Sequence, residues 1–132
     1  MKVFITDDSE LVVDRLVSML SGIDNVEIVG QAKDAQDAIE SILKLQPDLV
    51  ILDIRLRWGN AMDVVDVIKK KQPSSRIIIL TSYPYPIYRK KFLEAGADYF
   101  LDKSTEFEKI PQIFEQVVAQ RTASAMANGC TN

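Results

Sequence analysis

The fold of this chain is decided by the stretch Leu49-Val50-Ile51-Leu52-Asp53, in which four aliphatic residues are followed directly by a carboxylate. Aliphatic residues in a row, without polar alternation, are typical of a strand covered on both faces, as in a parallel sheet flanked by helices. Asp53 would then stand at the carboxyl end of that strand, which is the edge where ligands bind in open α/β sheets. The stretch therefore predicts both the fold class and the place of the functional site.

Polar side chains also end three other apolar runs of the chain. The runs over residues 2–6, 76–81 and 98–103 end on Asp7 with Asp8, on Thr81 and on Lys103, respectively. Because the carboxyl ends of parallel strands meet at one edge of a sheet, we expect these side chains and Asp53 to share one small volume. Taken singly, each is more often a turn residue, a helix cap or a solvated side chain. Their joint occurrence at four strand ends favours a functional site.

Strands and helices alternate along the sequence. We expect strands over 2–6, 26–29, 49–52, 76–81 and 98–103. The first two helices are expected to begin at the caps Ser9 and Asp34 and to end at about residue 20 and before Pro47. The other three are expected over 61–71, from Pro86 to about 95, and after Lys103 with Pro111 in the first turn. Five successive units predict an α/β fold, a parallel sheet with helices on both faces. Residues 1–121 are expected to form this domain, and residues 122–132 a polar tail or the stub of a linker.

Composition excludes several classes of protein. A chain of 132 residues with a net charge of -3 is expected to form one domain and not to bind nucleic acid directly, since such proteins usually carry a basic face. No apolar run reaches the roughly 18 residues of a membrane helix and no signal peptide is evident, so we expect a cytoplasmic protein without membrane contact. The single cysteine, Cys130, cannot form an internal disulfide, and the absence of histidine removes the usual zinc ligand and general base.

The acidic residues at the strand ends indicate a metal. Carboxylates at close range repel one another unless a cation neutralises them. Mg²⁺ prefers oxygen ligands, which matches Asp8 and Asp53 with Asp7 in reserve. A lysine and a hydroxyl aimed at the same point would neutralise and orient a phosphoryl group. The residues therefore predict phosphoryl transfer to Asp53, which would act as the nucleophile and become an aspartyl phosphate.

These residues carry a resemblance to a known family. From Lys2 to Gln120 the chain resembles the response-regulator receiver domain (CheY-like) of two-component signal transduction, with Asp7, Asp8, Asp53, Thr81 and Lys103 in the family's order and a similar stretch over 95–103. The resemblance implies a flavodoxin-like, doubly wound, five-stranded parallel sheet of order 2-1-3-4-5 with five helices. It also implies a phosphorylation-dependent regulator that changes its partner-binding surface and is not an enzyme beyond its own phosphorylation and autodephosphorylation.

The resemblance assigns a role to each acid of the site. Asp8, Asp53 and the backbone carbonyl of Arg55 would bind Mg²⁺, with Asp7 acting through water. Asp53 would be the phosphoacceptor, supplied by the phosphohistidine of a sensor histidine kinase or a phosphotransfer protein. The surface of the fourth helix, fifth strand and fifth helix would then contact an output partner, and a homodimer formed on phosphorylation is a further expectation.

The switch residues come from the same resemblance. Thr81 would move toward the phosphoryl group, Lys103 would pair with one of its oxygens, and Phe100 would swing inward behind it. Arg55 lies two residues beyond Asp53, and Tyr83 lies two residues beyond Thr81. In this family these two positions tune the lifetime of the phosphoryl group. We expect their bulk to hinder the water that would hydrolyse the aspartyl phosphate.

The chain departs from the family pattern at two places. Lys103 is followed by Ser104 where the family has a proline joined through a cis bond, and a cis bond to a non-proline residue costs about 3 to 4 kcal/mol. Either the site supports that strain or Lys103 sits differently. Arg57 and Ala61 replace a proline and a glycine of the loop after Asp53, and this altered loop leaves open a second hypothesis, a degenerate receiver that acts as a phosphorylation-independent scaffold.

Other interpretations differ in what they require of the sequence. An aspartate-nucleophile phosphatase usually has an Asp-x-Asp pair, whereas here Asp53-Ile54-Arg55 follows the strand, and no glycine-rich nucleotide-binding loop is present. For the aromatic residues Trp58, Tyr83 and Tyr85, partner recognition and simple loop packing are both consistent with the sequence.

Overall fold

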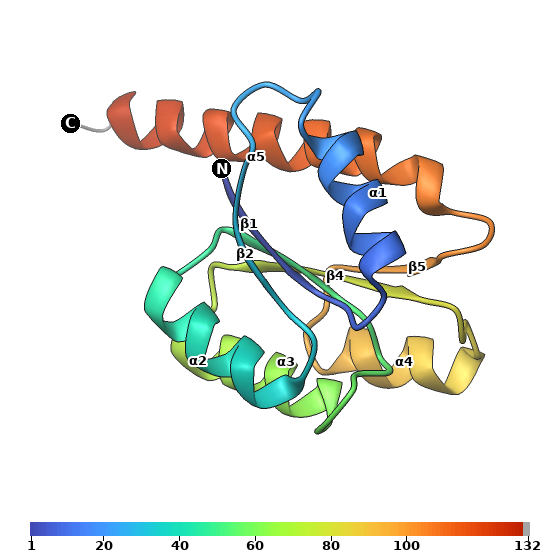
Figure 1. Ribbon diagram of the computed structural model, residues 1–132. Helices are drawn as coiled ribbons and strands as arrows, with labels where there is room; N and C mark the ends of the chain where they lie inside the picture. The colour runs from blue at the N-terminus through green and yellow to red at the C-terminus, as the bar shows by residue number, and fades with distance from the viewer. Residues whose placement is uncertain (131–132) are drawn as a thin grey trace.

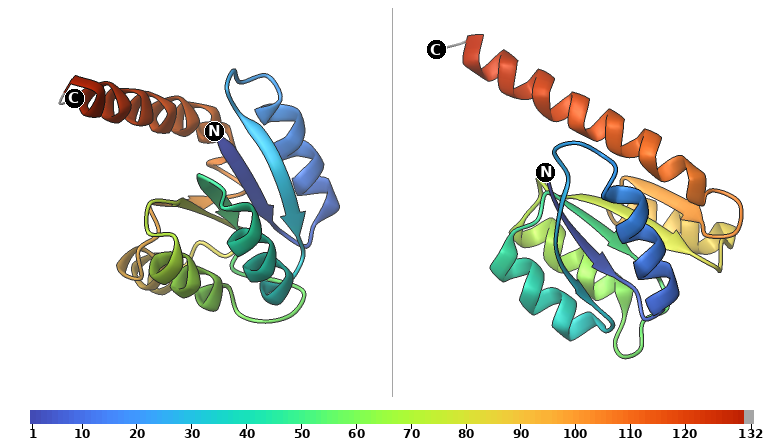
Figure 2. Two further views of the ribbon diagram at one scale, coloured as in Figure 1. Left: turned by 90° about the vertical axis from the view of Figure 1, so that its left-hand side faces the viewer. Right: turned by 45° about the horizontal axis from the view of Figure 1, so that its top comes forward.

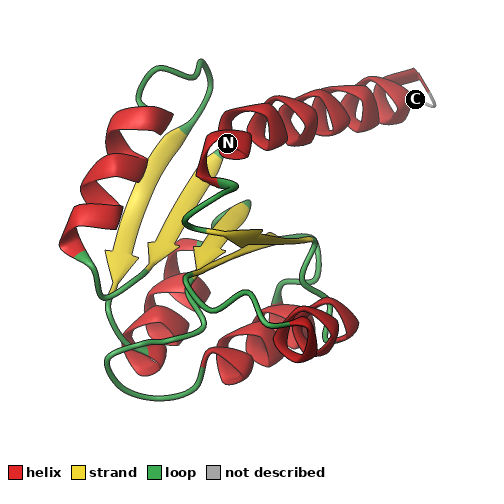
Figure 3. Ribbon diagram, turned by 90° about the vertical axis from the view of Figure 1, so that its right-hand side faces the viewer, coloured by secondary structure: helices red, strands yellow, loops and turns green. Residues whose placement is uncertain are grey.

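The protein is built on one five-stranded parallel sheet with the order β2-β1-β3-β4-β5 (Figures 1 and 3). The computed structural model describes the backbone of residues 1–130 and the side chains of residues 1–121. The strands are β1 (Lys2–Thr6), β2 (Glu27–Ala32), β3 (Leu49–Leu52), β4 (Arg76–Thr81) and β5 (Tyr99–Asp102). All four neighbouring pairs are parallel. The predicted doubly wound fold is confirmed.

Helices cover both faces of the sheet. They are α1 (Glu10–Leu20), α2 (Ala35–Leu45), α3 (Ala61–Lys71), α4 (Pro86–Glu94) and α5 (Ile110–Cys130), with a short 3-10 turn over Phe107–Lys109. Helices α1 and α5 lie on one face, and α2, α3 and α4 lie on the other (Figure 1). The five expected helices are therefore present.

Strand β3 contributes alternate side chains to two separate cores. Leu49 and Ile51 pack with α1 and α5, whereas Val50 and Leu52 pack with α2, α3 and α4. All four are at most 1% exposed, and each such burial contributes about 1.5–3 kcal/mol. The uninterrupted aliphatic run is thus explained by a strand that has no solvent face.

Local sequence signals fix where the helices begin. The Ser9 hydroxyl accepts a hydrogen bond from the amide of Val12 at 3.3 Å, and a carboxylate oxygen of Asp34 accepts one from the amide of Asp37 at 2.8 Å, so both predicted caps are confirmed. Pro86 opens α4, as expected. The two caps start α1 and α2 within a few residues of the carboxyl ends of β1 and β2.

Two boundaries differ from the sequence expectation. Strand β2 covers 27–32 rather than 26–29, because Gly30 lies inside the strand and does not end it. Its lack of a side chain makes room for the ring of Phe4, whose Cε2 atom would lie 3.0 Å from a Cβ at this position. Helix α5 continues to Cys130, so it runs into the stretch 122–132 that the sequence predicts to be a polar tail or the stub of a linker (Figure 2). Residues 131–132 of that stretch lie outside the described residues. Alanine is the strongest helix former, so this stretch extends the helix without an apolar stripe.

Candidate functional site

The polar residues at the strand ends are held in place by the backbone of the sheet. The amide of Asp7 donates to the carbonyl of Ala32 at 3.0 Å, and the amide of Asp53 donates to the carbonyl of Thr6 at 2.9 Å. The amide of Lys103 donates to the carbonyl of Thr81 at 2.9 Å. The sheet hydrogen bonding thus continues one residue past these strands, which places their polar side chains at one rigid edge.

Lys103 joins two of the acids. Its Nζ atom lies 2.8 Å from Oδ2 of Asp7 and 2.9 Å from Oδ2 of Asp53. Asp7 and Asp53 are 2% and 5% exposed, whereas Asp8 is exposed. Carboxylate oxygens of all three acids lie within 4.8 Å of one another. The structure therefore brings together four of the residues that the sequence placed at one site.

Burial and charge oppose each other at this cluster. Desolvation raises the pKa of Asp53 above its ordinary value, and the hydrogen bond from Lys103 only partly offsets that rise. Desolvation alone would lower the pKa of Lys103, but hydrogen bonds to Asp53 and Asp7 outweigh it and raise the pKa, so the ammonium form is retained. Three carboxylates against one ammonium leave the site negative.

The donor set fits a hard divalent cation. Carboxylate oxygens are ligands that Mg²⁺ prefers, and opposite ligands around Mg²⁺ lie about 4.2 Å apart. The oxygens of Asp7, Asp8 and Asp53 lie within 4.8 Å of one another, which is close to that spacing. The residues present therefore fit Mg²⁺.

Thr81 is the last residue of β4, and Phe100 lies inside β5, where it pairs with Ile79. The Thr81 side chain is fully buried, and its hydroxyl oxygen accepts a hydrogen bond from the amide of Tyr83 at 2.9 Å. Phe100 is 5% exposed and packs in the core beneath α3 and α4. The Arg89 guanidinium on α4 donates to the carbonyl of Phe100 at 3.1 Å. Movement of either side chain on phosphorylation stays a prediction.

Arg55 and Tyr83 form a bridge next to Asp53. The amide of Arg55 donates to Oδ1 of Asp53 at 3.2 Å, and the guanidinium carbon of Arg55 lies 4.2 Å from the centre of the Tyr83 ring. A cation over an aromatic face at this distance is an attractive contact. The loops after β3 and β4 are therefore linked beside Asp53.

The peptide bond after Lys103 is trans, since the structure has no cis bond within residues 1–130. Of the two alternatives left by the sequence, a strained cis bond before Ser104 is therefore wrong. Lys103 nevertheless reaches both acids. The residue after it, Ser104, forms a tight turn in which its amide and hydroxyl donate to Oδ1 of Asp102 at 2.9 and 2.7 Å.

Sequence reasoning missed the way in which the loop after β3 is anchored. The amide of Arg57 donates to the carbonyl of Lys33 at 3.0 Å, and the amide of Ala35 donates to the carbonyl of Trp58 at 2.9 Å. Gly59 has a φ of 83° and packs so closely that a Cβ there would lie 2.6 Å from that of Ala35. The glycine in Trp58-Gly59 was the one available signal for this turn.

Comparison with known proteins identifies the family. Residues 3–115 match the model of the response regulator receiver domain. The uncharacterized transcriptional regulatory protein YvfU of Bacillus subtilis is 31% identical over 117 residues, which cover 89% of this chain and 58% of that protein. The response regulator protein VraR of Staphylococcus saprophyticus is 32% identical over 113 residues, covering 84% and 53%. The chain belongs to the response regulator receiver domain family, and the predicted resemblance is confirmed.

Solved structures agree with this assignment. The response regulator domain of Thermotoga maritima CheB superposes with a TM-score of 0.78 at 26% identity, covering 90% of this chain and 94% of that one. The chain spans a little over half the length of the two curated relatives named above. Within residues 1–130, no helix is long and apolar enough to cross a membrane. The chain is a receiver domain of two-component signalling, a class that acts through phosphorylation.

Proposed function

We propose that Asp53 is the phosphoacceptor of this receiver domain and that Mg²⁺ bound by Asp8 and Asp53 supports the transfer. The observation that carries this proposal is the bridging of buried Asp7 and Asp53 by Lys103 at 2.8 and 2.9 Å. Removing two carboxylates from water is costly, and a structural role alone would be met more cheaply by apolar residues. The cluster is better explained by a ligand that brings its own charge.

The transfer moves the phosphoryl group from nitrogen to oxygen. A carboxylate oxygen of Asp53 attacks phosphorus, the new O–P bond forms, and the P–N bond to the donor histidine breaks with its electron pair passing to the ring nitrogen. Bound Mg²⁺ would neutralise negative charge on the phosphoryl oxygens. Lys103 supplies a second positive charge at the same place, and the buried Thr81 hydroxyl is free to donate a hydrogen bond to a phosphoryl oxygen.

The donor we propose is a sensor histidine kinase or a phosphotransfer protein in the cytoplasm, because this chain contains no histidine of its own. Phosphorylation of Asp53 then shifts the domain between two states and alters the surface of α4, β5 and α5. Arg55 would also offer its carbonyl to the metal, with Asp7 acting through water. Phe100 would complete the switch, and a homodimer of the phosphorylated form is part of the proposal.

The test is phosphorylation of the whole chain by acetyl phosphate in the presence of Mg²⁺, followed by intact mass. We expect the addition of one phosphoryl group, dependent on Mg²⁺ and lost in Asp53→Asn. Asp66→Asn is the matched control, because Asp66 is an exposed acid on α3 outside the site. Equal labelling of the Asp53→Asn variant and the parent would refute Asp53 as the acceptor.

A degenerate scaffold is the second candidate, and the replacement of the family's loop proline and glycine by Arg57 and Ala61 favours it. It predicts no Mg²⁺ binding and no labelling, whereas our proposal predicts both.

Loading with beryllofluoride and measuring the molecular mass in solution tests the proposed homodimer. Repeated turnover of phosphate esters would contradict the expectation that the chain is not an enzyme.

A further inference from the structure

The loop between β3 and α3 presents a tryptophan to solvent. Trp58 is 70% exposed, although an indole of this size covers on the order of 150 Å² of apolar surface when buried. It is also the only tryptophan in the chain. The surface around it is separate from the acid cluster at Asp53 and is not used by the proposed phosphoryl transfer.

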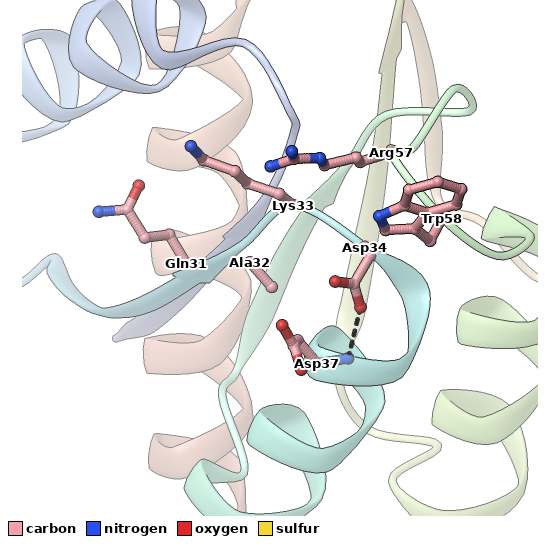
Figure 4. Close-up of a pocket in the computed structure, with 7 residues that line it drawn as sticks. All are labelled: Gln31, Ala32, Lys33, Asp34, Asp37, Arg57 and Trp58. Carbon is pink, nitrogen blue, oxygen red and sulfur yellow. Dashed lines mark hydrogen bonds between the residues drawn. The ribbon is translucent and has the colours of Figure 1, made fainter.

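Two hollows adjoin this indole, each with a volume of about 310 Å³. They share Asp34, Asp37 and Trp58 as walls. Figure 4 shows the first hollow, with the indole beside Asp34, with Asp37 on the far side of Asp34, and with Lys33 and Arg57 extending away from these acids. The second hollow is completed by Gln36 and Gly59, and its only charged walls are the two acids. We call these five residues of the second hollow the Trp58 face.

The acids of the Trp58 face lack a cation. Among the described side chains, no lysine or arginine forms an ion pair with Asp34 or Asp37. Lys33 is paired instead with Glu10, at 2.9 Å. The pKa of Asp37 lies above its ordinary value, chiefly because the Asp34 carboxylate is close to it. A positive group brought to this face would relieve that repulsion.

The backbone beneath the indole is already ordered. The hydrogen bonds that join Arg57 to Lys33 and Ala35 to Trp58 fix the loop against the start of α2. Gly59 also lies so close to Ala35 that a Cβ at position 59 would be 2.6 Å from that of Ala35. A surface that is fixed before binding loses less conformational entropy when it is occupied. The exposed indole of Trp58 therefore lies on a loop whose backbone is held by hydrogen bonds to the start of α2.

We propose that the Trp58 face is a docking site for a partner protein, which it recognises through an arginine side chain of that partner. A guanidinium group is planar, so it can stack on the indole while its N–H groups donate to carboxylates beside the ring. An acidic side chain or a phosphate would be repelled by Asp34 and Asp37. This inference does not depend on phosphorylation of Asp53.

The single indole provides a direct probe of the Trp58 face. The whole ¹⁵N-labelled chain is titrated with acetyl-Gly-Arg-Gly-amide, and the indole N–H signal of Trp58 and the amide signal of Asp37 are followed. The reference ligand replaces arginine with citrulline, which has nearly the same shape but no charge. We expect both signals to shift with millimolar affinity for the arginine peptide and with affinity about fivefold weaker for the citrulline peptide.

Paired variants test which residues carry the affinity. The double variant Asp34→Asn with Asp37→Asn keeps a side-chain oxygen at position 34 that can cap α2. It should weaken the binding of the arginine peptide about fivefold. Asp63→Asn with Asp66→Asn is the matched control, since these exposed acids have the same spacing on α3, and it should leave binding unchanged. A dispersed spectrum confirms that each variant is folded.

Three outcomes would overturn the proposal. They are equal shifts with the arginine and citrulline peptides, no shift of the Trp58 signal with either, and an equal loss of affinity in the two pairs of variants. A Trp58 signal that moves when the protein alone is diluted would show that the occupant is a second copy of the chain, which would also contradict docking of a different partner.

Discussion

Replacing Lys103 by methionine should destabilise the protein far more than replacing any exposed lysine. The substitution keeps the length of the side chain but removes the ammonium that contacts Asp7 and Asp53 at 2.8 and 2.9 Å. A hydrogen bond between charged groups contributes about 1.5–3 kcal/mol, and removing one partner of a buried ion pair costs about 3–5 kcal/mol. Lys103 keeps 13% of its side-chain surface exposed, so water reaches the acids and reduces that cost.

We therefore expect Lys103→Met to lower the free energy of unfolding by about 2–4 kcal/mol. Urea unfolding at neutral pH without divalent cations measures this loss, and with a slope of about 2 kcal/mol per molar the midpoint falls by roughly 1–2 M. Lys70→Met is the control, because Lys70 is exposed on α3, and we expect a change within about 0.5 kcal/mol.

A double-mutant cycle identifies the cause. If the decrease in the free energy of unfolding comes from repulsion between Asp7 and Asp53 once the ammonium is gone, Asp53→Asn should reduce the effect of Lys103→Met by about 1–3 kcal/mol. Equal effects of Lys103→Met and Lys70→Met would refute the reasoning, since they would mean that the ammonium does not compensate the buried carboxylates. A large penalty that is unchanged by Asp53→Asn would place its origin in packing.

Three further outcomes are expected. The double variant Arg55→Asn with Tyr83→Ala removes the bridge beside Asp53, so autodephosphorylation, measured as phosphate release, should be faster. An unchanged rate would show that the bridge does not exclude water. The pKa of Asp37, followed by carboxyl chemical shifts against pH, should fall toward its ordinary value in Asp34→Asn, because the repelling charge is gone. Mg²⁺ at a hundredfold excess over its dissociation constant should add about 2.7 kcal/mol of stability, and Asp8→Asn should lose most of that gain in a thermal melt.

The strand ends were predictable because they combine two simple patterns. The aliphatic run before Asp53 requires cover on both faces, and parallel strands bring their carboxyl ends to one edge. These two facts predict that Asp7, Asp53 and Lys103 lie together, and the distances from Lys103 Nζ to the two carboxylates confirm that prediction. Side-chain identity was sufficient here because the sheet itself determines where these residues lie.

Other features depend on contacts between segments that are distant in sequence. Gly30 has the pattern of a strand end, yet it continues β2 because the ring of Phe4 needs the space. Residues 122–130 lack an apolar stripe, so only their helix propensity could have indicated that α5 continues. The hydrogen bonds that anchor Trp58 to the start of α2 use backbone groups alone, so Gly59 was the one residue that could have indicated this turn.

The anchored loop determines where movement can spread from Asp53. Arg55 and Trp58 lie on the same connection between β3 and α3, but its second half is bonded to Lys33 and Ala35. A phosphoryl group that displaces the Arg55 side chain therefore meets a fixed loop on the side of α2. On the other side, Arg55 contacts Tyr83, which leads into α4, a helix with a single buried side chain, Phe92. Because α4 is the more weakly held of the two neighbours, we expect the signal to pass through Tyr83 to α4, while the Trp58 face keeps its shape in both states.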